Sequence, residues 1–294
     1  MQHRTVPERL GEAINLAVLI LAALVMLFPF YYIVIVSFSS YQDYMESDLL
    51  LWPKHWVLDS YSFIFASKEF IRSIGVTVFI TVVGALFSLI MTSSMGFALT
   101  RRAWGQSFFM FLVLFTFIFS AGLIPSYLIV KETGLIDTYW ALIIPVAINP
   151  FNLIVMRQFF MGIPEELNES AVIDGANEMQ IFLRIIIPLS KPALAAFGLF
   201  YAVVQWNTYF SAILYLNTPS KWTVQVILRQ IVILNDATNT LASAARDAAR
   251  SAHMPPPETI GMAAILLATV PILIVYPFLQ KHFAKGVMLG SVKG

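Results

Sequence analysis

The chain has 294 residues, of which 59% are hydrophobic and only 12% are charged. An ordinary soluble domain carries ~25% charged residues, so this composition argues against a soluble globular protein and predicts one embedded in a membrane. The net charge of +1 gives no indication of a nucleic-acid partner. The absence of cysteine excludes disulfides and thiolate metal sites.

Six charge-free windows follow one another along the chain. They cover residues 13–42, 73–100, 103–130, 138–156, 192–220 and 259–280. Each is long enough for the ~20 apolar residues that cross a bilayer as a helix, so we predict an all-α integral membrane protein with six transmembrane helices. The first window is too long for a signal-peptide core and is expected to remain as the first span. Pro145, Asn149 and Pro150 predict a kink in the fourth.

The positions of the basic residues indicate the orientation. Arg101 and Arg102 lie in a short turn between two windows, and three lysines lie near the C-terminus. Short cytoplasmic segments are enriched in Lys and Arg, so we place both termini in the cytoplasm. The predicted regions are a cytoplasmic N-terminus (1–12), a six-span permease domain (13–282) with a cytoplasmic loop (164–188) and extracytoplasmic loops (39–70 and 215–259), and a cytoplasmic tail (283–294).

The second extracytoplasmic loop is unusually long for a connector. It begins with an apolar run, WTVQVILRQIVIL, which is expected to pack on the membrane surface as a helix. An alanine-rich stretch, LASAARDAARSAH, predicts an exposed helix, and three prolines at 255–257 predict a stiff spacer. A role in contacting a partner and a role as a passive cap both remain open.

The cytoplasmic loop at 164–188 carries five acidic residues and one basic residue, so it cannot lie in hydrocarbon. Its pattern predicts two short helices. Pro164 suits a first helical turn, and Glu165 and Glu166 suit the positive end of the helix dipole. Gly175 can take the positive φ that ends a helix.

The second short helix of this loop has its own start and stop signals. Asn177 followed by Gln180 is typical of a capping box. Pro188 is expected to end the helix. A helix–turn–helix of this kind predicts a docking element.

The interiors of the spans contain no Asp, Glu, Lys or Arg away from their ends. Ion- and proton-coupled transporters place ionisable groups at membrane depth, so the energy for transport must come from elsewhere. The four histidines lie outside the spans, and no nucleotide-binding or catalytic motif is present, so we predict no metal ligand and no catalytic residue. An ion-coupled secondary transporter for a small polar solute is the alternative, and it would require an intramembrane ion site and an inverted repeat.

Polar residues inside the spans are candidates for a substrate path. Amides and hydroxyls beside aromatic rings suit a neutral polyol or sugar. Hydrogen bonding between helices, and an aromatic at the membrane interface, would account for the same residues. Asn149 could face the path or satisfy backbone groups freed by Pro150. The candidates are Asn149, Gln205, Trp206, Asn207 and Tyr209.

The cytoplasmic loop resembles the EAA loop of importer-type ABC transporter permeases. That signature has E-A-A, three residues, G, nine residues and I-x-L-P. The glutamate Glu169, the glycine Gly175 and the final proline Pro188 all stand at the right spacing. Ser170 replaces the middle alanine, and Ile187 replaces the leucine.

The C-terminal sequence Tyr276–Gly294 is similar to the tail of MalG-type carbohydrate permeases, as is the span containing Gln205, Trp206 and Asn207. The resemblance implies the type I ABC importer permease architecture in a bacterial cytoplasmic (inner) membrane. It also implies a homologous second permease, two copies of an ATPase that binds ATP and Mg²⁺, and an extracytoplasmic solute-binding protein. This chain itself is then expected to bind no cofactor.

The same resemblance assigns roles to the loop and a class to the substrate. The substrate would be an oligosaccharide, and within this branch the tail is most similar to permeases for acidic ones such as alginate or pectin fragments. The residues expected to couple to the ATPase are Glu165, Glu166, Glu169, Ser170, Ala171, Asp174, Gly175, Ala176, Phe182 and Pro188.

Overall fold

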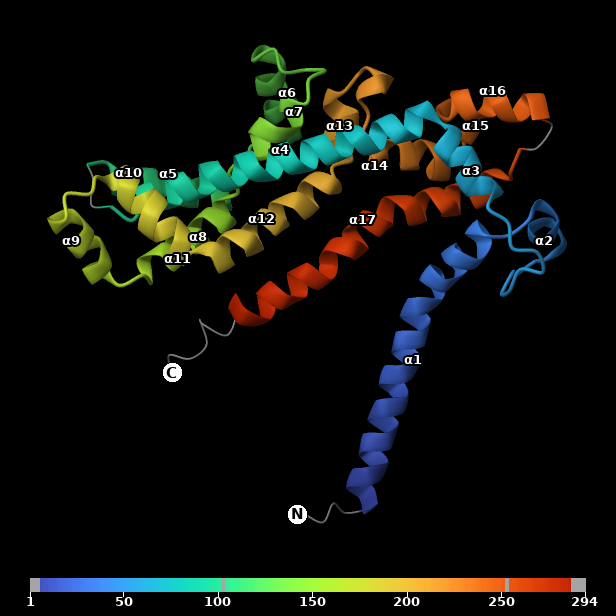
Figure 1. Cartoon of the computed structure of the whole chain (residues 1–294), viewed down its shortest axis with the longest axis horizontal. Coiled ribbons are helices and arrows are strands. Elements are labelled where there is room, and N and C mark those ends of the chain that lie inside the picture. Colours follow the sequence, from blue (N-terminus) through green and yellow to red (C-terminus); the bar gives the residue numbers. More distant parts are fainter. Residues whose placement is uncertain (1–5, 102–103, 252–253, 287–294) are drawn as a thin grey trace. The chain divides into compact units, whose positions relative to one another are not determined.

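The computed structural model describes residues 6–101, 104–251 and 254–286 (Figure 1). These described residues are mainly helical and contain no β-strand, apart from an isolated bridge between Ser39 and Trp56. The predicted all-α class is therefore confirmed. The helices are α1 (Val6–Ser37), α2 (Tyr41–Glu46), α3 (Asp59–Ala66), α4 (Lys68–Ala98), α5 (Gln106–Ile118), α6 (Leu123–Glu132), α7 (Trp140–Ile143), α8 (Pro150–Met161), α9 (Glu165–Ile173), α10 (Glu178–Ile181), α11 (Ile187–Leu189), α12 (Lys191–Trp206), α13 (Phe210–Tyr215), α14 (Val224–Leu228), α15 (Ala237–Thr240), α16 (Ala242–Ser251) and α17 (Pro257–Gly286).

Three helices in the described part of the chain are long and apolar enough to cross a membrane. They are Ile14–Ser37 within α1, the whole of α4, and Pro257–Val275 within α17. Two further pairs of helices pass the same test together but are bent, so up to five spans are seen by length and composition. Six spans therefore remain a prediction.

The first bent pair is the predicted kink. Trp140–Val146 and Pro150–Met161 meet at 53°. Residues Ile144–Val146 form a 3₁₀ turn, and Asn149 has extended backbone before α8 begins at Pro150. The second pair, Glu178–Leu189 with Lys191–Trp206, bends by 84°.

The third window, residues 103–130, is not one helix. It forms α5 and most of α6, with an irregular segment at residues 119–122. Gly122 has φ +82° and ψ 179°, a conformation that is essentially restricted to glycine. The apolar composition predicted the membrane segment, but this glycine geometry interrupts its helix.

The chain divides into two compact units. The first contains residues 1–71 and 228–269. Within it, Ser60 Oγ donates to Thr259 Oγ1 at 2.9 Å, and the amide of Lys68 donates to Ser243 Oγ at 3.0 Å. A cavity of about 610 Å³ is lined by residues of α3, α16 and the segments that adjoin them.

The two expected helices of the long loop are present. The apolar run is helical; Val224, Val226 and Ile227 near its start are buried, and Val232, Ile233 and Leu234 at its end are exposed. Packing of this run on the membrane surface stays a prediction. The alanine-rich stretch forms α16, yet Ala244 and Ala245 are buried, so one face of this helix is covered. The short alanine side chain is what allows such close packing.

The second unit contains residues 72–227 and 270–294 and holds three apolar clusters. One includes Ile80, Leu142 and Tyr215. A second brings Phe97, Met156, Phe160, Ala171, Ile181, Phe182, Ile186, Ala193 and Phe197 together at the α9–α10 end. A third joins Leu99, Val113 and Leu153. The second cluster includes buried residues of the segment 164–188 and packs it against the rest of the unit.

Candidate functional site

The loop at 164–188 forms the predicted helix–turn–helix from α9 and α10 (Figure 1). Gly175 has φ +82°, as expected for the residue that ends α9. The amide of Gly175 donates to Val172 O at 3.0 Å, and the amide of Ala176 donates to Ala171 O at 2.9 Å. An added Cβ at Gly175 would meet nothing within 4 Å, so the backbone conformation alone requires glycine.

The predicted capping box is present at the start of α10. Asn177 Oδ1 accepts from the amide of Gln180 at 2.9 Å, and Gln180 Oε1 accepts from the amide of Asn177 at 2.9 Å. These two bonds satisfy amides that the first helical turn leaves unpaired. The short second helix is thus fixed by its own sequence.

Two helix boundaries in the loop differ from expectation. Pro164 lies just before the first turn, and α9 begins at Glu165. The second helix ends at Leu189, one residue after Pro188, and the chain bends by 84° there. Residues Phe182–Ile186 form a π-helix in which the amide of Ile187 bonds to the carbonyl of Phe182. This wider turn accommodates the proline ring.

The predicted coupling residues divide into an inner and an outer face. Ala171 and Phe182 are buried in the apolar cluster beneath the loop, and Ala176 is half-buried beside them. The outer face is exposed and carries Glu165, Glu166, Glu169, Ser170 and Asp174. The small and aromatic residues of the motif therefore hold the loop in place, while its acids face outward.

Exposed apolar side chains on the same loop were not predicted. Ile173 at the end of α9 is 85% exposed, and Val172 and Met179 are 58% and 63% exposed. They lie among exposed carboxylates, which exclude contact with hydrocarbon. A protein surface is what would remove such side chains from water. We name Val172, Ile173 and Met179 the apolar tip.

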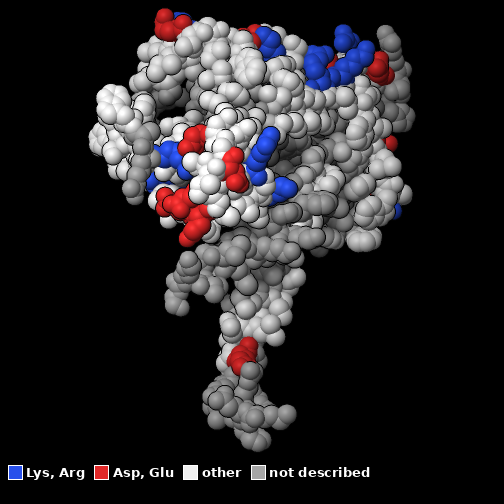
Figure 2. Space-filling model, turned by 60° about the vertical axis from the view of Figure 1, so that its left-hand side comes forward, with Lys and Arg blue, Asp and Glu red and all other residues white. Residues whose placement is uncertain are grey.

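The arginine-containing turn after α4 contacts this loop. Arg101 Nε lies 2.9 Å from Glu178 Oε2, and the Arg101 guanidinium lies 4.5 Å from the centre of the Phe97 ring. Arg157 Nε donates to Leu99 O at 2.9 Å. Figure 2 turns the α9–α10 end forward and shows acidic and basic groups close together within a largely uncharged surface.

The predicted substrate-path residues occupy different environments. Gln205 is 1% exposed, and its Nε2 donates to Leu142 O at 3.5 Å. Trp206 is also buried, and Tyr209 is half-buried. Asn207 is exposed and bonds to Val203 O within its own helix end. That these residues line a substrate path stays a prediction.

Asn149 acts locally on the helix that follows it. Its side chain is exposed, and Oδ1 accepts from the amide of Asn152 at 3.2 Å, so it is the N-cap of α8. Asn149 therefore satisfies an amide rather than the carbonyls freed by Pro150. Within the described part of the chain, no group of three or more His, Cys, Asp or Glu side chains is placed to hold a metal.

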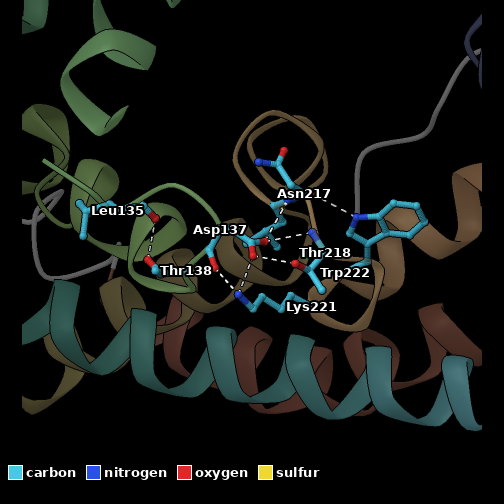
Figure 3. Close-up of polar contacts among 8 residues, drawn as sticks. Leu135, Asp137, Thr138, Asn217, Thr218, Lys221 and Trp222 are labelled. Atoms are coloured by element: carbon cyan, nitrogen blue, oxygen red, sulfur yellow. Dashed lines mark hydrogen bonds and ion pairs between the residues drawn. The ribbon is translucent and has the colours of Figure 1, made fainter. Parts of the chain in front are cut away.

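A polar cluster fastens two connecting segments that the predicted topology places outside the cell (Figure 3). Asp137 Oδ1 accepts from the amides of Asn217 and Thr218 at 3.0 Å each. Its Oδ2 accepts from Thr218 Oγ1 and Lys221 Nζ at 2.7 Å each. The hydrogen bond from Lys221, with those from Thr218, holds the pKa of the Asp137 carboxyl well below its ordinary value. We name Asp137, Thr218 and Lys221 the outer clasp.

The comparisons with known proteins identify the family. Residues 93–289 match the family described as "Binding-protein-dependent transport system inner membrane component". The chain belongs to this family. It is thus a membrane-embedded permease subunit of an ABC importer, as the EAA resemblance indicates.

Similar proteins cover nearly the whole chain. It is 47% identical over 293 residues to Protein LplC of Bacillus subtilis (strain 168), covering 99% of this chain and 98% of the relative. It is 47% identical to the polygalacturonan/rhamnogalacturonan transport system permease protein YtcP of the same strain, covering 98% and 99%.

A solved structure agrees with the predicted permease architecture. It is the crystal structure of a bacterial ABC transporter involved in the import of the acidic polysaccharide alginate. One of its chains matches with a TM-score of 0.89 and 33% sequence identity, covering 96% of this chain and 100% of that one. The importer permease fold is therefore confirmed.

Proposed function

We propose that this chain is one of two permease subunits that carry an acidic oligosaccharide across the bacterial inner membrane, driven by a separate ATPase. The substrate class rests on similarity. One relative is named for polygalacturonan and rhamnogalacturonan, and a structural neighbour for alginate. The second permease is either a homologue or another copy of this chain, and the extracytoplasmic partner is a solute-binding protein.

The observation that carries the proposal is the exposed helix–turn–helix of α9 and α10. Its outer face combines carboxylates with the apolar tip, in a segment that cannot enter hydrocarbon. ATP and Mg²⁺ would bind the partner ATPase, and closing of that ATPase would move this loop. The spans have no Asp, Glu, Lys or Arg away from their ends, which supports an energy source outside this chain.

The contact between Arg101 and Glu178 supports a cytoplasmic position for the loop. It brings the short arginine turn to the same end of the second unit as α9 and α10. Arginine-rich short turns favour the cytoplasmic side. Both termini would then be cytoplasmic if the chain crosses six times.

Recognition of an acidic sugar would not depend on cations within these spans, because none lies there. Carboxylates of the substrate would be bound by the binding protein, by the other permease or by neutral donors of this chain. Hydroxyls and amides can donate to a carboxylate without carrying a charge.

The test is reconstitution of the complete complex in liposomes with its binding protein. We expect oligogalacturonate and alginate fragments to stimulate ATP hydrolysis and to be taken up, while neutral oligosaccharides of equal length do neither. Uptake driven by an ion gradient without ATP would contradict ATP-driven transport. Stimulation by the neutral panel alone would contradict the acidic substrate.

A further inference from the structure

The bend between α7 and α8 frees backbone groups from helical hydrogen bonding. In the 3₁₀ turn at Ile144–Val146 amides bond three residues back, as the amide of Ala147 does to Ile144 O at 3.2 Å. The carbonyl of Leu142 and the amide of Asn149, on the two sides of this turn, therefore need other partners. Inside a membrane such groups must be satisfied by protein or by water in a cavity.

Two side chains of α12 provide those partners. Gln205 Nε2 donates to Leu142 O at 3.5 Å, and the amide of Asn149 donates to Tyr201 Oη at 3.4 Å. Tyr201 and Gln205 are four residues apart and so lie on one face of α12. Tyr201 Oη also shares a hydrogen bond of 2.7 Å with Thr92 Oγ1 of α4. One helix face thus contacts both sides of the bend.

Gln205 is held there by close packing. An added Cβ on Gly84 would lie 2.9 Å from Gln205 Cδ and Nε2, so Gln205 keeps this position only while α4 has glycine there. Gln205 Oε1 is buried and has no hydrogen-bond partner among the described residues. Methionine would fill a similar space without an unmet acceptor. Packing alone therefore does not account for a glutamine here.

The same face of α12 reaches the coupling loop at its other end. Phe197, one turn before Tyr201, belongs to the cluster that holds Ala171 and Phe182 of the loop. Met156 and Phe160 of α8 belong to that cluster as well. The helices α8 and α12 therefore share the loop's core at one end and are joined through the bend at the other.

We propose that Tyr201 and Gln205 are positioning residues for energy coupling. They set the angle between α7 and α8 while the coupling loop is at rest. Movement of the loop tilts α8, and the long bond from Gln205 to Leu142 is the one that breaks. This inference rests on the proposed function, because it takes the loop at α9–α10 as the point where the ATPase acts.

The first test measures the bend directly in the assembled complex. The chain has no cysteine, so spin labels can be placed at the far ends of the bent pair, at Trp140→Cys and Met161→Cys, whose native side chains are both exposed. Gln205→Met and Tyr201→Phe are expected to broaden or shift the distance distribution between the labels. Val204→Ala, an exposed position on the same helix, is the matched control and should leave it unchanged. An unchanged distribution in both test variants overturns the proposal.

The second test measures coupling. Loss of one interhelical hydrogen bond in a membrane weakens the resting bend about threefold, so Gln205→Met and Tyr201→Phe should raise the number of ATP molecules hydrolysed per sugar by up to about that factor. Assembly and thermal stability should match those of Val204→Ala. A parallel fall in stability, hydrolysis and uptake would mean a packing role only and overturns the positioning role. If sugar fails to stimulate even the unmodified complex, the proposed function fails, while the label distances still decide this inference.

Discussion

The turn at Gly175 offers the sharpest test of the coupling loop. Its φ of +82° costs a residue with a Cβ roughly 1–2 kcal/mol. Because nothing lies within 4 Å of an added Cβ, Gly175→Ala should introduce this backbone strain and no clash. A penalty of that size lowers the population of the native turn relative to other conformations by roughly 5- to 30-fold.

Proline at the same position should do more damage. It fixes φ near −65° and has no amide hydrogen, so Gly175→Pro loses the bond to Val172 O and cannot adopt the native turn. The direction of α10 relative to α9 then changes. Gly175→Asn is the control, because asparagine tolerates the left-handed region better than other residues with a Cβ.

The assay is ATP hydrolysis by the purified complex, with and without sugar-loaded binding protein, alongside uptake into liposomes. We expect stimulated hydrolysis and uptake to fall in the order wild type, Gly175→Asn, Gly175→Ala, Gly175→Pro. Co-purification of the ATPase separates loss of coupling from loss of assembly. Normal stimulated hydrolysis in Gly175→Pro would refute this account of the loop.

Three other expectations concern single contacts. Ile173→Ser should leave the stability of this chain nearly unchanged, because the side chain is 85% exposed, but should weaken ATPase co-purification about tenfold or more, the loss expected for one buried isoleucine. Asp137→Asn and Lys221→Met should lower the melting temperature at pH 7. Because the pKa of Asp137 is depressed in the folded chain, the ionised carboxylate stabilises the fold at any pH above its ordinary pKa, and this stabilisation is lost in strong acid. The melting temperatures of wild type and Asp137→Asn should therefore converge in strong acid. Melting temperatures that stay apart would contradict this. Gly84→Ala should lower the free energy of unfolding, measured in detergent solution, by about 1–3 kcal/mol, because the added Cβ overpacks against Gln205. Adding Gln205→Ala to this variant removes the side chain that is met and should recover part of the loss.

Much of the coupling loop could be predicted because its structure is local. The capping box joins Asn177 to Gln180, three residues apart, and the turn bonds of Gly175 and Ala176 reach only to Val172 and Ala171. Such contacts depend on a few neighbouring residues. The end of the helix near Pro188 was predicted to within one residue, but the π-turn at Phe182–Ile186, which packs in the cluster around Phe182, was not predicted.

The environment of the polar span residues could not be predicted in the same way. Gln205, Leu142 and Gly84 are far apart in the sequence, and only packing of three helices brings them together. Alternation of polar and apolar residues cannot tell a side chain that faces a path from one that satisfies a bent backbone. The apolar tip was missed for a similar reason, since exposure depends on what the rest of the chain covers.

The sequence by itself determined that this protein lies in a membrane, that its spans carry no Asp, Glu, Lys or Arg away from their ends, and that the loop at 164–188 forms a helix–turn–helix. Those conclusions follow from hydrophobicity, from missing charges and from short-range hydrogen bonds, which act over one helix or less. Only the tertiary structure decided that the third window breaks before Gly122, and that Gln205 contacts the bend that the prolines of the fourth window predict. Those features depend on side chains from separate helices that meet only when the chain is folded.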